Sequence, residues 1–353
     1  METATAGKPG PSAAGDRRAP GPGTDQKTVP GAKHMASVNT DQRAAAPGPS
    51  ATAVRDPKPR KRKKHKHNRA AYAFLTPWLI GIFGLTLIPM AYSLYLSMTN
   101  YNLLTAPSWI GFKNYTLLFQ DPNFIQSAKV TLEYVVFSVP LKLGAALLVA
   151  VLLNKKIRGL SFYRSAFYLP SLIGASVAVA VMWQQVFSQQ GLLNEFLSVF
   201  GIHGQDWIGQ PSTALWTLIL LSAWQFGTPM LIFLAGLKQL PKDVYEAADL
   251  DGSGPIRTFV KITLPLLSPM IFFNLVLETI NAFQTFTPAY VISGGQGGPI
   301  GSTLLYTLYL YQKGFGSLEM GYASAMAWIL FLVIGAFTAI YFATARRWVT
   351  YGD

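Results

Sequence analysis

The chain has 353 residues, of which 50% are hydrophobic, with a mean hydropathy of +0.29 and a formal net charge of +13. It contains no cysteine, which excludes disulfide bonds, thiolate nucleophiles and cysteine metal ligands. This composition indicates a membrane protein and argues against a soluble enzyme.

Residues 1–70 are strongly basic. They hold 15 Lys and Arg against 5 acids, whereas residues 71–353 hold 14 against 11. Because few of them are aromatic or branched and apolar, we predict a disordered cytoplasmic tail. Its last part, KPRKRKKHKHNR (58–69), has the charge of a nucleic-acid-binding patch, but it directly precedes the first apolar run, where positive charge sets orientation and contacts anionic lipid. We therefore expect contact with membrane lipid and no nucleic-acid partner.

Residues 71–348 carry six apolar runs long enough to cross a membrane, which takes about 20 helical residues. Helices are the expected structure, because an open sheet would leave backbone groups unpaired in lipid. We predict an all-α membrane protein with six transmembrane helices, near 74–98, 131–153, 166–188, 214–237, 266–290 and 323–344.

Lys and Arg between the predicted spans indicate orientation, because they gather on the cytoplasmic side. If the tail lies in the cytoplasm, the connections on the outer side hold three basic residues, Lys113, Lys129 and Lys313. The inner connections and the C-terminus hold ten: Lys155, Lys156, Arg158, Arg164, Lys238, Lys242, Arg257, Lys261, Arg346 and Arg347. This difference predicts that both termini are cytoplasmic.

Residues 238–265 join the fourth and fifth spans on the predicted cytoplasmic side. Pro241 suits a helix start, and VYEAADL favours a helix until Gly252 and Gly254 force a turn. A second helix then begins near Ile256 and enters the membrane. The first helix should expose the acids Asp243, Glu246 and Asp249. The small residues Ala247 and Ala248 lie beside them, so that another protein can approach the helix backbone closely.

Polar residues inside the predicted spans mark either a substrate path or contacts between helices. Four in the fifth span are spaced four, three and four residues apart, which places them on one helical face: Asn274, Glu278, Asn281 and Thr285. Gln284 lies beside this face. The fourth span adds Trp224, Gln225 and Thr228.

Lys142 and Glu278 are the two charged residues predicted at mid-membrane depth. Each lies about 12 residues, or roughly 18 Å, from the cytoplasmic end of its span. A charge at this depth is costly and seeks a partner, so one hypothesis is a buried ion pair across the path. In the alternative, Lys142 reaches a polar pocket along its flexible stem and Glu278 acts alone.

Metal binding and catalysis find no support in the sequence. Three of the four histidines lie in the tail, His203 stands alone, and no pair of nucleophile and base is apparent. We expect no metal site, no cofactor in this chain and no enzymatic activity.

The connection at 238–265 carries a recognisable motif. Glu246-Ala-Ala, three residues, Gly252, nine residues, Ile262, one residue and Leu264-Pro265 resembles the EAA motif of binding-protein-dependent ABC importer permeases. Further segments are similar to the carbohydrate-importing branch, which includes maltose and glycerol-phosphate permeases: GFKNY (111–115), FYRSAFYLPSLIGASVAVAVMW (162–183), GLLN (191–194) and SGGQGGPIGSTLLYTLYLY (293–311). The resemblance covers about residues 72–348.

This resemblance implies the type I ABC importer permease fold in a bacterial inner membrane. The helix near 244–250 would sit in a cleft of a separate ATPase subunit, and Glu246, Ala247, Ala248, Asp249, Gly252, Ile262, Leu264 and Pro265 would form the coupling element. The implied partners are a second permease, two ATPase copies that bind ATP-Mg, and an extracytoplasmic solute-binding protein. The chain itself has no G-x-x-x-x-G-K-[ST] phosphate loop, and its glycine cluster at 294–301 is expected to face the binding protein.

The resemblance also implies sugar contacts from the fourth and fifth spans, where aromatic faces and amides suit a sugar's ring faces and hydroxyls. Glu278 departs from this pattern, because an amide is more usual for a neutral sugar. The same-class alternative is an importer of glycerol-phosphate or another solute. Two further alternatives are an ion-coupled secondary transporter with Lys142 and Glu278 as its relay, and a membrane-tethered nucleic-acid binder that uses the tail.

Overall fold

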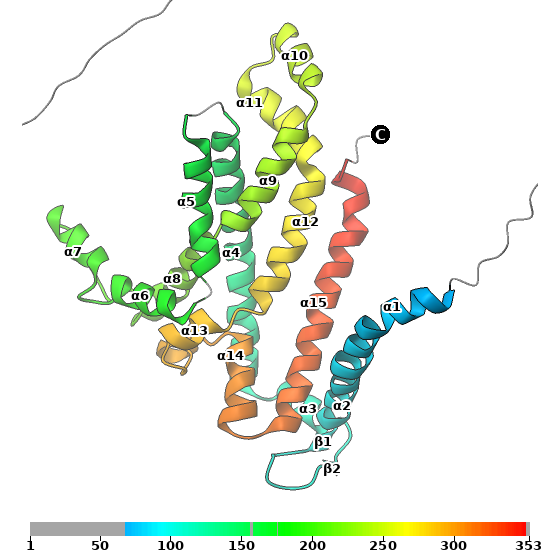
Figure 1. The fold of residues 1–353 in the computed structure, drawn as a ribbon. Coiled ribbons are helices and arrows are strands. Elements are labelled where there is room, and N and C mark those ends of the chain that lie inside the picture. Colours follow the sequence, from blue (N-terminus) through cyan, green and yellow to red (C-terminus); the bar gives the residue numbers. More distant parts are fainter. Residues whose placement is uncertain (1–67, 156–157, 175, 351–353) are drawn as a thin grey trace, which may run out of the picture. The chain divides into compact units, whose positions relative to one another are not determined.

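The computed structural model describes residues 68–155, 158–174 and 176–350, which fold almost entirely into helices and belong to one compact unit, residues 66–353 (Figure 1). Lys156 and the predicted tail up to residue 67 lie outside the described residues. Four helices are long and apolar enough to cross a membrane, and two bent helix pairs bring the number to six if each pair is one span. The described part of the chain therefore agrees with the predicted all-α membrane fold.

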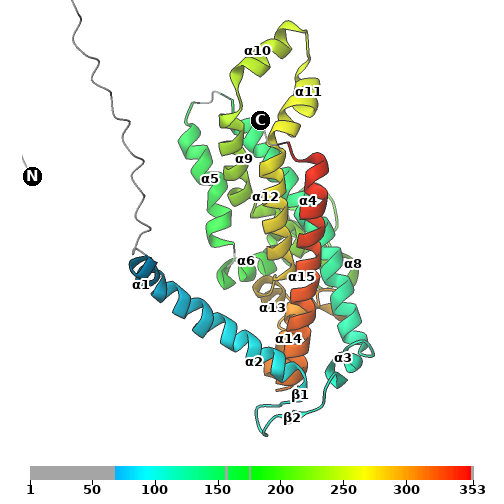
Figure 2. The ribbon, with the colours of Figure 1, turned by 90° about the vertical axis from the view of Figure 1, so that its right-hand side faces the viewer.

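The first span is a nearly continuous helix over Tyr72–Ser97, close to the predicted 74–98. It consists of α1 (Asn68–Ile80), the π-helical η1 (Gly81–Leu87) and α2 (Ile88–Ser97). A short antiparallel hairpin follows, β1 (Thr99–Asn100) and β2 (Ser108–Trp109). Figure 2 shows α1 leaning away from the other helices, whereas α2 meets α15 beside this hairpin.

The second span, α4 (Pro122–Leu153), is the central helix, and it packs against α8, α9 and α12. It follows the short α3 (Lys113–Leu118) and begins nine residues before the predicted 131. Pro122 suits the first turn, and the Asp121 carboxylate accepts a hydrogen bond from the Asn123 N–H at 2.9 Å, which caps the helix. Ala146 and Ala150 are fully buried one turn apart, so a neighbouring helix can approach closely.

The third and fourth spans are bent. The predicted single helix over 166–188 is instead α5 (Leu160–Ile173) and α6 (Val177–Phe187), followed by α7 (Leu192–Val199). The Ser176 side chain accepts from the Val179 N–H and so starts a new helix inside the apolar run. The fourth span is α8 (Pro211–Trp224) and α9 (Gly227–Gln239), bent by 41° at Gln225–Phe226.

The connection after α9 folds much as its sequence predicts. α10 (Lys242–Leu250) is followed by a turn in which Gly252 has a positive φ of 70°, and then by α11 (Pro255–Thr258) and the π-helical η2 (Phe259–Thr263). The fifth span continues through α12 (Leu264–Phe283) and ends with α13 (Thr287–Ile292). We refer to the end of the bundle that carries α10 as the α10 end, and to the opposite one as the hairpin end.

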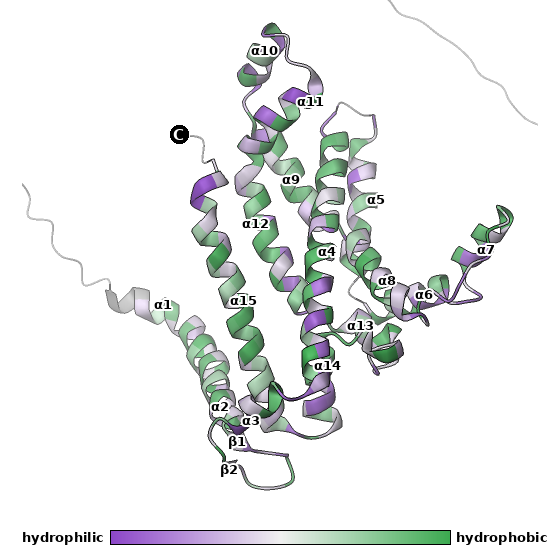
Figure 3. Ribbon diagram, turned by 180° about the vertical axis from the view of Figure 1, so that it is seen from behind, coloured by the Kyte–Doolittle hydropathy of each residue, from purple (hydrophilic) through white to green (hydrophobic). Residues whose placement is uncertain are grey.

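The sixth span is α15 (Met320–Trp348), which runs from the hairpin end to the α10 end (Figure 1). Before it lie η3 (Pro299–Gly301), α14 (Tyr306–Tyr311) and η4 (Gln312–Gly316). Figure 3 shows mostly hydrophobic residues along α15 and a hydrophilic patch at its C-terminal end, where Arg346 and Arg347 lie. At the hairpin end, Asp121 joins α4 to α14 and α15, because its carboxylate accepts hydrogen bonds from the hydroxyls of Tyr309 and Tyr322.

Candidate functional site

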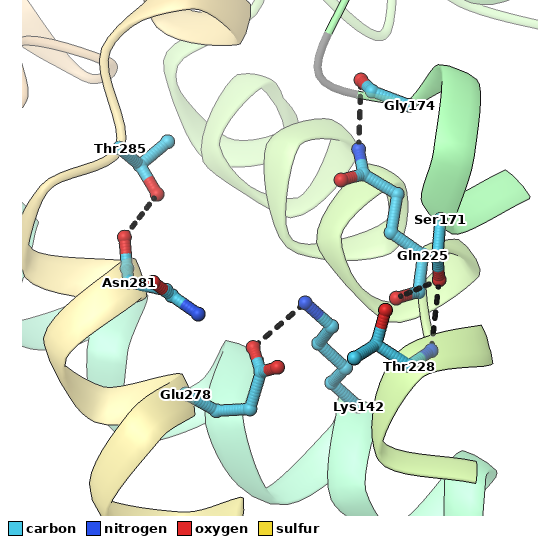
Figure 4. Close-up of polar contacts among 8 residues, drawn as sticks. All are labelled: Lys142, Ser171, Gly174, Gln225, Thr228, Glu278, Asn281 and Thr285. Carbon is cyan, nitrogen blue, oxygen red and sulfur yellow. Dashed lines mark hydrogen bonds and ion pairs between the residues drawn. The ribbon is translucent and has the colours of Figure 1, made fainter. Parts of the chain in front are cut away.

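Lys142 and Glu278 form an ion pair in the interior of the bundle. Lys142 lies on α4 and Glu278 on α12, and 2.7 Å separates Nζ from Oε2 (Figure 4). The two side chains are only 14% and 9% exposed. A charge this far from water is tolerated because its partner is within hydrogen-bonding distance.

The ion pair lines a cavity of about 360 Å³ between α4, α8 and α12. This volume lies within the range of small-molecule sites, about 300–1,000 Å³. The cavity wall includes five residues that the polar pattern of the fourth and fifth spans picks out: Gln225, Glu278, Asn281, Gln284 and Thr285. Amides, a hydroxyl, an ammonium and a carboxylate therefore converge on one space, which is suited to a ligand with many hydroxyl groups.

Three residues of the predicted path do not line this cavity. The Trp224 ring lies beside the Trp183 ring, with their centroids 5.9 Å apart. The backbone N–H of Thr228 donates to Ser171 Oγ at 3.1 Å. Asn274 is 1% exposed, and its side chain donates to the Met270 carbonyl of its own helix at 3.0 Å. Trp224 and Thr228 therefore contact other helices, whereas Asn274 bonds to the backbone of its own helix.

Sequence reasoning missed three polar residues of the cavity wall: Tyr134, Ser222 and Thr287. A signal for one of them was present, because Tyr134, Ser138 and Lys142 follow each other at spacings of four and so share a face of α4. This face lies opposite the polar face of α12. Ser138 Oγ is buried and has no hydrogen-bond partner in the described part of the chain.

The bend between α8 and α9 is fixed by a group of hydrogen bonds (Figure 4). Gln225 Nε2 donates to the Gly174 carbonyl at 3.1 Å, and Ser171 Oγ donates to the Gln225 carbonyl at 2.9 Å. A Cβ added to Gly174 would lie 2.5 Å from Gln225 Cδ, so only glycine fits there without a shift. Both bent spans are thus joined at Gln225, which also faces the cavity.

The predicted coupling element at the α10 end exposes Asp243, Glu246 and Asp249, as expected from its sequence. Ala247 is exposed as well, but Ala248 is 5% exposed and packs inward, so the expectation of two exposed small residues is wrong for Ala248. Its burial follows from the turn, in which the Ser253 N–H bonds to the Ala248 carbonyl at 2.9 Å and brings the chain back over it. Two large apolar side chains project beside the acids, Leu250 at 90% exposure and Ile256 at 80%.

The other predicted residues of the coupling element lie at the start of the fifth span. Ile262 is half-buried in η2. Leu264-Pro265 forms the first turn of α12, where a proline is tolerated because backbone N–H groups in the first turn have no carbonyl partner within the helix. Ser268 Oγ donates to the Pro265 carbonyl at 2.6 Å and accepts from the Thr350 N–H at 2.8 Å. These bonds connect the start of α12, at the base of the predicted coupling element, to the residues after α15.

Among the described residues, no group of three or more His, Asp or Glu side chains is arranged to hold a metal ion.

Comparison with known proteins identifies the family. A model of the family described as the inner membrane component of binding-protein-dependent transport systems matches residues 129–350. The chain belongs to this family. It is therefore a multi-pass component of a transport system of the inner membrane, and the resemblance to binding-protein-dependent importer permeases is confirmed.

Individual relatives agree with this assignment. The chain is 54% identical over 286 residues to the probable ABC transporter permease protein YesP of Bacillus subtilis, covering 80% of this chain and 93% of that protein. It is 33% identical over 270 residues to the arabinooligosaccharides transport system permease protein AraP of the same organism, covering 75% and 85%. It shares its fold, with a TM-score of 0.70 and 22% identity, with a chain in the crystal structure of a bacterial alginate ABC transporter in complex with an alginate pentasaccharide-bound periplasmic protein, covering 82% and 98%.

Proposed function

We propose that this chain is a permease subunit of an ATP-driven importer, and that it moves a carbohydrate inward by alternating access. The cavity between α4, α8 and α12 carries the proposal, because its amides, hydroxyls and single ion pair can hydrogen-bond a polyhydroxylated ligand inside the bundle. The similarity to an arabinooligosaccharide permease supports the substrate class. The chain itself carries out no enzymatic reaction in this scheme.

The proposed partners follow from the family. A second permease completes the path, and two copies of an ATPase subunit bind ATP-Mg, so this chain needs no cofactor of its own. An extracytoplasmic solute-binding protein delivers the sugar, in line with the periplasmic protein in the alginate transporter structure. The exposed acids and apolar side chains of α10 and the following turn would dock into the ATPase.

In the proposed topology the α10 end and both termini face the cytoplasm. The excess of Lys and Arg in the connections at this end supports this orientation. The motion of the ATPase would then pass through α10, α11 and η2 directly into α12, which carries Glu278 and the polar face of the cavity.

An uptake experiment tests the function. Cells that lack this chain should lose uptake of one class of carbohydrate, and the plasmid-borne chain should restore it. Uptake should stop when ATP is depleted and continue when a protonophore collapses the proton gradient with ATP maintained. Uptake that follows the ion gradient instead would support an ion-coupled carrier, with Lys142 and Glu278 as relay, and would contradict the proposal. Uptake of a glycerol-phosphate but of no sugar would contradict the substrate class alone.

A further inference from the structure

A second, larger cavity of about 740 Å³ lies at the α10 end, away from the central one. Its walls come from the C-terminal end of α4, the end of α9, one face of α10, and the segment from the turn after α10 to η2. These are the elements that would carry motion between an ATPase and the spans. The central cavity and this one have no lining residue in common.

The charge of this cavity is predominantly positive. Lys155 lines it from just after α4, Lys238 from the last turn of α9 and Lys242 from the start of α10, and Asp249 is the one acid among the lining residues. Lys242 is the first residue of α10, where the helix dipole disfavours a cation. An anion held between these lysines and the first turn of α10 would be stabilised by both and would relieve their mutual repulsion.

The wall of the cavity is apolar on the side of the spans. Val151, Leu237 and Phe259 contribute there, and α4 ends its apolar run two residues after Val151, at Leu153. The lysines therefore lie where the apolar spans meet the aqueous connections. A small soluble anion would gain no contact energy from an apolar wall. A phospholipid matches both parts of the cavity, because its charged phosphate is joined to apolar acyl chains.

We propose that this cavity binds the phosphate headgroup of an anionic phospholipid of the inner leaflet. Lys155, Lys238 and Lys242 contact the phosphate oxygens, and the first part of an acyl chain lies against Val151, Leu237 and Phe259. The inference rests on the topology of the proposed function, in which this end faces the cytoplasm. A lipid bound there bridges α4 and α9 to α10 and η2 and so supports the coupling element.

Lipid retention by the purified full-length chain tests the site. The chain is reconstituted in phosphatidylcholine vesicles with or without phosphatidylglycerol, extracted with mild detergent, and examined by native mass spectrometry for retained phosphatidylglycerol. The triple variant Lys155→Gln, Lys238→Gln, Lys242→Gln should lose about 100-fold in phosphatidylglycerol affinity, because three charge contacts are removed. All three lysines are exposed, so their replacement removes no packing.

A matched triple variant controls for total charge. Lys261→Gln, Arg346→Gln, Arg347→Gln removes three exposed charges near the same end but outside the cavity, and it should retain phosphatidylglycerol. Equal loss in both triple variants would show general attraction to the surface and would overturn the proposal, as would retention in both. If the cavity triple misfolds, Lys238→Glu alone should lower retention in a chain whose melting temperature is unchanged.

Two further outcomes separate the alternatives. Displacement of phosphatidylglycerol by inorganic phosphate at equal concentration would indicate a site for free anions and would overturn the lipid assignment. Lipid retention is measured without transport, so a failed uptake experiment with retained phosphatidylglycerol would reject the proposed function and leave this site standing.

Discussion

Lys142 and Glu278 lie 136 residues apart in the sequence, and their side chains meet 2.7 Å apart between α4 and α12. Each helix belongs to a different span, so the pair joins two parts of the cavity wall. α12 also continues directly from the coupling element, whereas α4 is the central helix of the bundle. A relative movement of α12 and α4 would change this contact, which places the pair where it can respond to the state of the transporter.

Breaking one side of the pair should be more harmful than removing both sides. Lys142→Met leaves the Glu278 carboxylate buried without its partner, at a cost of about 3–5 kcal/mol, and should abolish uptake or assembly. Lys142→Met with Glu278→Gln should recover part of this loss. Uptake and the melting temperature of all four forms complete a double-mutant cycle.

A partly exposed ion pair elsewhere in the described residues serves as a control. Lys313 and Glu319 lie 3.3 Å apart with side chains 23% and 45% exposed, and such a pair contributes about 0–1 kcal/mol. Lys313→Met and Glu319→Gln should therefore show little coupling. Additive losses at Lys142 and Glu278 would reject their pairing as functionally important and leave Glu278 as a candidate sugar ligand.

The sequence allows the cavity to be predicted only in part, for a physical reason. Glu278 and Asn281 belong to one uninterrupted helix, so residue spacing gives their common face, and Thr285 follows two residues after the end of this helix and also lines the cavity. Residue spacing does not predict which side chains share a face over residues 224–228, because α8 ends at Trp224 and α9 begins at Gly227 in a different direction. Gln225 faces the cavity from the bend, while Trp224 and Thr228 contact other helices.

The break between α5 and α6 escapes prediction for a related reason. Residues 166–188 form an almost unbroken apolar run, and hydropathy alone cannot distinguish a straight span from a bent one. The break is supported by tertiary contacts that the local sequence does not contain, such as Gln225 bonding to the Gly174 carbonyl. The connection at 238–265 is easier to predict, because Pro241, Gly252 and Pro255 each act within a few residues.

Two changes in the coupling element should separate ATP hydrolysis from uptake. Gly252 has a φ of 70°, so Gly252→Val strains the turn by about 1–2 kcal/mol. Ala247 is exposed, so Ala247→Trp should obstruct docking without disturbing the chain. Each variant should remain in the membrane and lower uptake by about tenfold relative to ATP hydrolysis, the size of a typical coupling free energy.

Neighbouring positions provide the controls for the coupling variants. Gly254 has a negative φ and no atom near an added Cβ, so Gly254→Ala should leave uptake nearly normal. Ala248 is buried, so Ala248→Trp should lower the melting temperature, unlike Ala247→Trp. Normal uptake in both Gly252→Val and Ala247→Trp would contradict a docking role for α10.

Single-cysteine labelling should establish the orientation, because the natural chain has no cysteine and each introduced thiol is unique. Asp251, in the turn after α10, and Ser317, near the hairpin end, are both exposed. A membrane-impermeant maleimide should label Ser317→Cys in intact spheroplasts and Asp251→Cys only after lysis. The reverse pattern would place the α10 end outside and reject the proposed topology.

Stability at acid pH should depend on Asp121, which joins α4 to α14 and α15 at the hairpin end. Burial raises the pKa of its carboxyl, but hydrogen bonds donated by Tyr309, Tyr322 and the Asn123 backbone outweigh burial and hold this pKa below its usual value. A lowered folded-state pKa means that the stabilisation is present above the unfolded-state pKa of about 4 and is lost as the pH falls through the folded-state value.

Asp121→Asn keeps a side-chain oxygen that can cap α4 but removes the charge, so the variant should lose thermal stability at neutral pH and change less than the natural protein as the pH falls below about 4. Asp121→Ala removes the cap as well and should be less stable than Asp121→Asn at every pH, by about 1 kcal/mol. Thermal unfolding of the detergent-solubilised chain over a pH series measures all three proteins. Parallel pH profiles for the natural protein and Asp121→Asn would show that the charge of the carboxylate does not stabilise this junction and would contradict the prediction.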